Sequence, residues 1–335
     1  VTLHLDTASA FFTDGDSWVR VSIELEGEVP QENSRFFVDG QKFFSLVNTF
    51  DELEISGKTF LSETGNRFEI ESNTEGTDIP DLDDLAEFEK FSLVSDPDFL
   101  GHLKNAQSFL SSDANSPFSC IFFTGDKMVA IQDTKYYEAK MPFAIEDTVL
   151  PQNAVKILLS LFPTGELEFY VREVDEKRTV QIRFDGFDYR YSSSSNHELP
   201  IDIEAETFRS SFEHENFFVV NREEMVQNLR FLENFVREVA NTRARLHFKP
   251  SESQVSFEIT DNSHVIHAVS TESFTGDFQD DDNFLVSISD LRSSIQKIGS
   301  SKVAVRCDRA KAPIKFEEFE GDSSYFMIQV RLEED

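Results

Sequence analysis

The segment FFVVNREEMVQNLRFLENFV, residues 217–236, reads as a short apolar strand followed by an amphipathic helix. Asn221 is a good N-cap between the two parts. Apolar side chains then recur at helical spacing, at Met225, Leu229, Leu232 and Val236. From Leu246 onward, apolar and polar residues alternate around turn residues, as they do in antiparallel strands. The region therefore predicts a unit of one strand, one helix and about three further strands.

The same unit recurs along the chain. The other copies read FFVDGQKFFSLVNTF from Phe36, FSLVSDPDFLGHLKNAQSFL from Phe91, VLPQNAVKILLSLF from Val149 and FLVSISDLRSSIQKI from Phe284. The five copies start 55, 58, 68 and 67 residues apart. Asp39, Asp96 and Ser289 are the predicted N-caps of the helices in three of these copies. The first 25 residues align only with the strand half of a unit, so the repeat indicates five whole units and the last half of a sixth.

Paired in order, the units predict three α+β domains, at residues 1–88, 89–215 and 216–335. Similar strand turns recur about 120 residues apart, at TDGDSWV (13–19), IQDTKYY (131–137) and ITDNSHV (259–265). We expect the first domain to lack its leading strand and helix through truncation or disorder. Acidic linkers, GTDIPDLDDLAEFE and SNHELPIDIEAETF, separate the domains, and each contains a proline that favours extended chain.

The composition excludes several classes of protein. The net charge of -32 disfavours a general basic surface for nucleic acid or anionic membrane, so any contact with DNA must be local. No apolar run approaches the roughly 20 residues that span a bilayer. Cys120 and Cys307 lie in strand-like segments, which favours buried thiols and a reducing cytosol over a disulfide.

The sequence shows no enzymatic, metal-binding or cofactor-binding motif. The seven His residues have no zinc-site spacing, and no GxxxxGK phosphate loop occurs. The run Asp280 to Asp282 lacks the glycine and closing glutamate of an EF-hand, so a solvated loop is the better reading. We therefore expect a protein that is not an enzyme and uses no cofactor or metal.

Three motifs, taken in their order and spacing, resemble the bacterial DNA polymerase III β subunit, the sliding clamp. Ile79 to Asp84 (IPDLDD) matches an FPNLDD-like linker, and Ile328 to Leu332 (IQVRL) matches an MPMRL-like last strand. Ile131 to Tyr137 corresponds to an ATDGHRL-like turn in the middle domain. Departures, including Gln329 for proline and the acidic extension Glu333 to Asp335, suggest a phage-encoded or otherwise divergent clamp.

The resemblance implies a fold and a function. Two chains would close head to tail into a homodimeric ring, with antiparallel sheets outside and helices lining the hole. Such a ring encircles duplex DNA as a processivity factor and tethers the replicative DNA polymerase, the clamp loader and other factors through short peptide motifs. The expected location is the cytoplasm of a bacterium or of a phage-infected host cell.

The helices have the charge that a DNA-facing lining requires. Helices taken as 39–50, 96–111, 151–162, 221–240 and 289–299 hold eight basic and eight acidic residues, whereas the rest of the chain holds 23 and 55. Non-specific contacts to phosphates would use these basic side chains. The candidates are Lys42, Lys104, Lys156, Arg222, Arg230, Arg237, Arg292 and Lys297. Solvated helix faces with no role in DNA binding are the alternative reading.

The resemblance also implies a partner-peptide pocket between the middle and last domains. Carried over by position, its wall would include Phe118, Gln132, Thr134, Tyr136, Tyr137, Pro200, Phe326, Ile328, Val330, Arg331 and Leu332. For Phe326, Ile328 and Val330, ordinary core packing is an equal alternative. A turn that exposes paired tyrosines favours a recognition role for Tyr136 and Tyr137.

A second hypothesis comes from a different class of function. The strongly acidic chain, with few basic residues on its helices, could be a clamp-like interaction protein or decoy. It would bind the partners of a clamp without encircling DNA.

Overall fold

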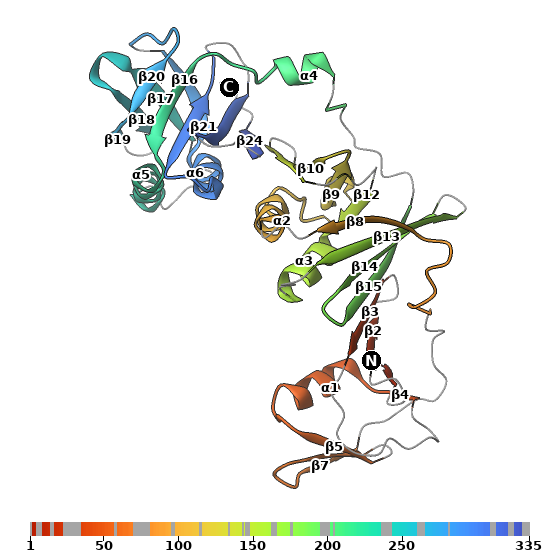
Figure 1. Cartoon of the computed structure of the whole chain (residues 1–335). Helices are drawn as coiled ribbons and strands as arrows, with labels where there is room; N and C mark the ends of the chain where they lie inside the picture. Colours follow the sequence, from red (N-terminus) through yellow and green to blue (C-terminus); the bar gives the residue numbers. More distant parts are fainter. Residues whose placement is uncertain are drawn as a thin grey trace. The chain divides into compact units, whose positions relative to one another are not determined.

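The computed structural model describes most of the chain (Figure 1). The described residues are 2–4, 9–13, 17–22, 35–56, 59–69, 81–94, 98–113, 116–132, 135–142, 144, 148–161, 166–174, 177–194, 202–203, 205–235, 243–259, 265–280, 282–308, 313–320 and 325–329. Among them, no helix is long and apolar enough to cross a membrane.

The order of the elements confirms the repeat. The half unit is β1 (Thr2–His4), β2 (Ser9–Thr13) and β3 (Ser17–Ser22). The next unit is β4 (Arg35–Phe37), α1 (Gly40–Val47), β5 (Leu53–Ser56), β6 (Thr59–Ser62) and β7 (Arg67–Glu69). It is followed by β8 (Glu89–Val94), α2 (Phe99–Gln107), β9 (Cys120–Thr124), β10 (Lys127–Gln132) and β11 (Lys135–Lys140).

The remaining units have the same composition. The fourth is β12 (Thr148–Pro151), α3 (Gln152–Leu161), β13 (Leu167–Val174), β14 (Lys177–Phe184) and β15 (Phe187–Ser194). The fifth is β16 (Phe217–Asn221), α5 (Arg222–Phe235), β17 (Arg243–Lys249), β18 (Gln254–Ile259) and β19 (Val265–Ser270). The last is β21 (Asn283–Ser287), α6 (Ile288–Lys297), β22 (Lys302–Arg306), β23 (Ile314–Glu318) and β24 (Tyr325–Gln329).

Four short elements were not predicted from the repeat. They are the helix α4 (Glu206–Ser210), the strand β20 (Ser273–Thr275) and the 3-10 turns η2 (Pro117–Ser119) and η3 (Pro250–Glu252). Of these, α4 bears directly on the candidate site.

Short polar side chains cap the helices, mostly as the sequence predicts. Asp39 accepts a hydrogen bond from Lys42 N at 2.9 Å, and Asn221 accepts one from Glu224 N at 3.0 Å. The predicted cap at Ser289 is wrong by two residues, because Ser287 Oγ accepts the bond from Asp290 N. Asp96, the predicted cap of the second helix, lies outside the described residues. Such caps satisfy amide groups that have no partner within the helix.

The described strands form four antiparallel sheets. Their strand orders are β4-β1-β2-β3-β15-β14-β13-β8, β12-β9-β10-β11-β24-β23-β22-β16-β20, β19-β18-β17-β21 and β5-β6-β7. The first two are continuous across predicted domain boundaries, because β3 pairs with β15 and β11 pairs with β24. Two predicted domains are thus joined at each of these strand pairs.

The chain groups into two compact units. One contains residues 1–97 and 161–197, and the other contains residues 98–160 and 198–335. The predicted middle domain supplies strands to both units, which follows from the two continuous sheets. The division into domains 1–88, 89–215 and 216–335 therefore stays a proposal based on the repeat.

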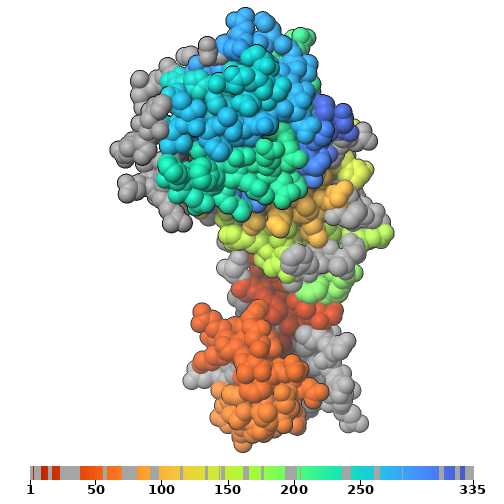
Figure 2. Space-filling model, turned by 90° about the vertical axis from the view of Figure 1, so that its left-hand side faces the viewer, coloured from red at the N-terminus to blue at the C-terminus, as the bar shows by residue number. Residues whose placement is uncertain are grey.

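In each unit, helices cover one face of a sheet. In the first unit, Phe43 and Leu46 of α1 pack in a core with Leu3, Ala10 and Phe60. Figure 2 shows α1 and the β5 to β7 sheet as one body in red-orange and orange. In the second unit, α5 and α6 lie side by side beneath the strands of the last repeats (Figure 1).

The linker motif IPDLDD has a structural role in the first unit. Leu82 is buried, and its carbonyl oxygen accepts a hydrogen bond from Gln181 Nε2 at 2.8 Å. The buried Asp188 accepts bonds from Arg20 Nε at 2.8 Å and Arg183 Nε at 2.6 Å. Arg20 also pairs with Asp83 of the linker at 2.6 Å. A buried polar network thus fastens the linker to the eight-stranded sheet.

Candidate functional site

An aromatic cluster lies on one face of the nine-stranded sheet, where strands of the middle and last repeats meet. We call it the Tyr136 cluster. Its buried members are Cys120, Phe122, Val129, Ile131, Tyr136, Val149, Ile203, Phe212 and Ile328. Phe118, Phe208 and Phe326 pack against it and are only partly buried. These three rings form the solvent-accessible part of an apolar surface.

Strand register places the cluster at the junction. In the β11 and β24 pair, Tyr136 lies opposite Ile328, and Glu138 lies opposite Phe326. Successive side chains of a strand point to opposite faces, so these alternate positions share one face. Residues 188 and 192 positions apart in the sequence thereby line the same surface.

The short helix α4 completes the cluster. The ring of Phe208 meets Tyr136 edge to face, with centroids 5.3 Å apart, and Phe212 lies 5.6 Å from Phe326. Arg209, between them, forms an ion pair with Glu138 at 2.9 Å, and the Glu138 side chain is 9% exposed. Tyr136 also donates a hydrogen bond to Glu138. A largely buried charge pair therefore holds α4 against β11.

Lys315 lies at the accessible rim of the cluster. Lys315 Nζ lies 4.6 Å from the centre of the Phe326 ring and 2.8 Å from Glu317 Oε2. Burial raises the pKa of the Cys120 thiol, so this cysteine stays neutral. An apolar surface with aromatic edges and a polar rim can anchor a few hydrophobic side chains of a peptide.

The structure brings together part of the predicted pocket. Phe118, Tyr136, Phe326 and Ile328 belong to the Tyr136 cluster. Gln132 ends β10 and is half-buried. Thr134, Pro200, Val330, Arg331 and Leu332 lie outside the described residues.

Tyr137 lies on the opposite face of the sheet and does not contribute to the cluster. A 2.7 Å hydrogen bond joins its hydroxyl to His102 Nδ1 of α2, and its ring lies 5.6 Å from Phe109. Burial raises its pKa. The expectation that a turn exposes both tyrosines is wrong, because Tyr136 and Tyr137 lie within β11 and are 5% and 0% exposed.

The Tyr137 face of the sheet carries α2 and α6. Tyr325 of β24 lies against His102, at 5.3 Å between ring centres, and accepts a hydrogen bond from Gly299 N at 2.5 Å. Lys135 pairs with Asp290 of α6 at 2.5 Å. The peptide-binding candidate and the helix layer thus occupy opposite faces of one continuous sheet.

The structure divides the eight predicted DNA-facing residues. Lys42, Lys104, Lys156 and Arg230 are exposed on α1, α2, α3 and α5 respectively. Arg237 lies outside the described residues. Arg222 donates to Ile298 O at 2.7 Å, and Arg292 pairs with Glu233 at 2.8 Å.

Lys297 is also engaged within the chain. Its amine lies 4.5 Å from the centre of the Phe109 ring and donates to Ser293 Oγ at 3.1 Å. Burial, assisted by the nearby charge of Lys135, lowers its pKa to about 8. Arg222, Arg292 and Lys297 are therefore held by contacts within the second unit.

Comparison with solved structures gives the fold. The Helicobacter pylori β clamp bound to a DNA ligase peptide matches with a TM-score of 0.77 and 14% identity, over 99% of this chain and 91% of that chain. The DNA polymerase sliding clamp of Bacillus subtilis matches with 0.77 and 13%, over 100% and 90%. The chain has the sliding-clamp fold.

The Thermotoga maritima DNA polymerase III β subunit also matches this chain, with a TM-score of 0.76 and 14% identity, over 100% of this chain and 91% of that chain. No protein-family model and no curated protein matches the sequence. The likeness thus lies in the backbone and covers nearly the whole chain, while the side chains have diverged.

Sequence reasoning missed the contribution of α4. The linker was expected to be extended because it contains Pro200. The signal lay further along, where Phe208 and Phe212 are four residues apart and so fall on one face of a helical turn.

Proposed function

We propose that the chain is a DNA sliding clamp, a non-enzymatic processivity factor that encircles duplex DNA and tethers a replicative polymerase in the cytoplasm. The observation that carries the proposal is the clamp fold over nearly the whole chain. The clamp loader and other factors would share the same docking surface. The sequence divergence is consistent with a phage-encoded clamp.

The exposed basic residues support a role in DNA binding. Lys104, Lys156 and Arg230 lie on helices of a unit whose sheet carries its partner cluster on the opposite face. Lys42 supplies a further exposed amine on α1. Phosphate contacts of this kind carry no base specificity and permit sliding. The acidic remainder of the surface would repel DNA from the outside of a ring.

The Tyr136 cluster is the proposed docking surface for partner peptides. Its half-exposed Phe208 and Phe326 would contact the peptide, over a floor formed by Tyr136 and Ile328. The Helicobacter pylori clamp with this fold was solved with a DNA ligase peptide, which is a suitable first probe. The proposed pocket retains Phe118 and adds Phe208 and Phe212, while Tyr137 is left out.

A matched pair of variants tests this docking surface. Phe208→Ala should weaken binding of the labelled DNA ligase peptide at least about tenfold, because truncating a central aromatic anchor typically costs about 2 kcal/mol or more. Val174→Ala, which removes an exposed apolar side chain from β13, should leave binding unchanged. Equal affinities of Phe208→Ala and the wild type, measured by fluorescence anisotropy, would refute the assignment.

Ring closure by two copies is supported by edge strands with apolar neighbours. Among the described strands, β7 and β19 lie at the ends of their sheets. Beside β19, the rings of Phe231 and Phe235 lie 5.9 Å apart, and these residues and Ile266 are 51%, 57% and 61% exposed. An edge strand bordered by exposed apolar side chains is suited to pairing with another chain.

The ring is tested by its mass in solution. Sedimentation equilibrium of the wild type should give a homodimer, and Phe235→Glu should give a monomer that keeps the wild-type circular dichroism spectrum. A wild type that remains monomeric at high concentration contradicts the ring.

The alternative is a clamp-like decoy that binds partners without encircling DNA. Two observations favour it: the net charge of -32, and the engagement of Arg222, Arg292 and Lys297 within the chain. A decoy would bind the peptide but would not remain on circular DNA, so retention on closed circles separates the two functions.

A further inference from the structure

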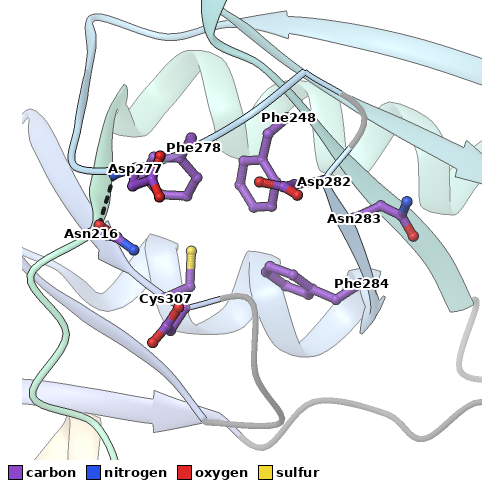
Figure 3. Close-up of a pocket in the computed structure, with 9 residues that line it drawn as sticks. Asn216, Phe248, Asp277, Phe278, Asp282, Asn283, Phe284 and Cys307 are labelled. Atoms are coloured by element: carbon purple, nitrogen blue, oxygen red, sulfur yellow. Dashed lines mark hydrogen bonds between the residues drawn. The ribbon is translucent and has the colours of Figure 1, made fainter.

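A cavity of about 100 Å³ opens into the last repeat pair, between the nine-stranded and the four-stranded sheets. Figure 3 shows it enclosed by the rings of Phe248, Phe278 and Phe284 and by the side chain of Cys307. Phe248 belongs to β17 and Phe284 to β21, while Cys307 follows β22. It is separate from the Tyr136 cluster and from the exposed basic side chains of the helices.

The aromatic walls are fixed by their packing. The Phe248 ring lies 4.9 Å from Phe278 and 5.4 Å from Phe284, measured between centroids. Phe278 also contacts Phe274 at 5.4 Å. Cys307 is fully buried. The walls therefore present ring faces and edges at defined positions, as a preformed site requires.

The loop that borders the cavity is held by hydrogen bonds from backbone amides to side-chain oxygens. Asp277 N donates to Asn216 Oδ1 at 3.0 Å, and Gln279 N donates to Asp282 Oδ2 at 2.8 Å. Gly276 has a φ of +99°, and a Cβ there would lie 2.0 Å from Asn216 Oδ1. Only glycine fits this position, and its backbone can therefore lie close to Asn216 at the opening of the cavity.

The groups that line the cavity favour a positively charged ligand. The charged side chains among the described residues that line it are Asp277, Asp282 and Asp308, all of them acidic. The faces of aromatic rings also carry negative electrostatic potential. Both features favour a cation that has apolar surface of its own.

A metal ion does not match these walls. Hard metal ions take several oxygen ligands at once, whereas three sides of this cavity are hydrocarbon. Within the described residues, no three His, Cys, Asp or Glu side chains gather closely enough to hold a metal ion. The favoured cation is therefore organic, with its charge spread over carbon.

We propose that this cavity binds the head group of a small alkylammonium ion. A water molecule occupies about 30 Å³ of liquid, so a cavity of this size has room for a group of a few heavy atoms. A quaternary ammonium group would place its methyl groups against Phe248, Phe278 and Phe284, with the carboxylates of the rim near its charge. This binding activity goes beyond the clamp function and does not depend on it.

The test compares choline with its neutral isostere, 3,3-dimethylbutan-1-ol, by calorimetric titration of the whole chain at constant ionic strength. Choline should bind saturably and at least about tenfold more tightly than the alcohol, because the two probes differ in charge and not in shape. Equal affinities of choline and the alcohol would overturn the proposal.

Two variants assign the binding to the cavity. Phe278→Leu keeps an apolar wall but removes a ring face, and Asp277→Asn removes one rim charge; each should weaken choline binding at least about threefold. Glu213→Gln removes an exposed acid outside the lining and should bind choline like the wild type. Unchanged affinity in both lining variants would contradict the assignment.

The head group could come from a free molecule or from a methylated lysine of another protein. A trimethyl-lysine peptide is therefore titrated beside choline. Tighter binding of the peptide indicates a protein source, and tighter binding of choline indicates a free molecule. Failure of both probes to saturate would refute the site.

Discussion

The central prediction concerns the four exposed basic residues on the helices. In the variant with Lys42→Gln, Lys104→Gln, Lys156→Gln and Arg230→Gln, the salt dependence of duplex binding should become shallower. These side chains are exposed, whereas Arg222 and Arg292 are engaged with a carbonyl and a carboxylate of their own unit. We therefore expect the exposed side chains to contact DNA phosphates and the engaged ones not to.

The magnitude follows from counterion release. Each phosphate neutralised contributes about 0.9 to the slope of log Kobs against log salt, so four contacts contribute about 3.6 per chain. Between about 50 and 200 mM salt, the wild type should therefore lose about 150-fold more affinity than the variant for each chain that contacts the duplex. This figure assumes one phosphate for each side chain.

The assay is fluorescence anisotropy of a labelled 20-base-pair duplex titrated at several KCl concentrations. The control variant, Arg222→Gln with Arg292→Gln, removes two helix charges that are engaged within the chain, and its slope should stay within about 1 of the wild type. Identical slopes for the wild type and the fourfold variant, or a larger change in the control, would refute the assignment of these residues to DNA.

Two further predictions concern stability. Asp188→Ala removes the carboxylate that Arg20 and Arg183 share, and should lower the free energy of unfolding by about 3 kcal/mol. This is the low end of the range for a broken buried ion pair, because both guanidinium groups are partly hydrated. The control Glu166→Ala, at an exposed site, should change the free energy of unfolding by less than about 0.5 kcal/mol, and similar urea midpoints for the two variants would contradict the network. The second is Lys297→Met. The pKa of Lys297 is lowered to about 8 in the folded chain, so above pH 8 the unfolded chain binds more protons, and the stability of the wild type relative to Lys297→Met should rise by up to about 2 kcal/mol between pH 7 and 9.5. A difference that is constant or falls with pH in urea unfolding would show that the amine is not desolvated.

The repeat could be predicted because the spacing of apolar residues along a short segment distinguishes a helix from a strand. Met225, Leu229 and Leu232 fall on one face of α5, and all three are buried. The unit of one strand, one helix and three strands then follows for every copy. Caps such as Asp39 and Asn221 are also local, which is why their positions could be predicted.

The candidate site depended on contacts that local sequence does not encode. Tyr136 and Tyr137 are neighbours, yet strand alternation sends one to the aromatic cluster and the other to α2. Counting charges on helices could not distinguish the exposed Lys104 from Lys297, whose amine lies over a ring contributed by another repeat. The position of each lysine along its helix can be predicted from the sequence, but the residue that it contacts in the folded chain cannot.

The linker illustrates the same limit. The sequence identified the first linker only as an acidic, proline-containing segment, whereas Asp83 within it pairs with Arg20, which lies 63 residues earlier in the chain. The partner-facing ring of Phe208 likewise lies in the second linker, on α4. Both linkers therefore carry structural contacts as well as spacing the repeats.

The most direct test of the clamp function is retention on DNA of defined topology. The wild-type chain is loaded onto nicked circular DNA with its cognate loader, separated from unbound protein by gel filtration, and measured before and after the circle is cut once. A sliding clamp should stay with the circles and dissociate within minutes of linearisation. Equal retention on circular and linear DNA, or retention on neither, would contradict the proposal that this chain closes around DNA.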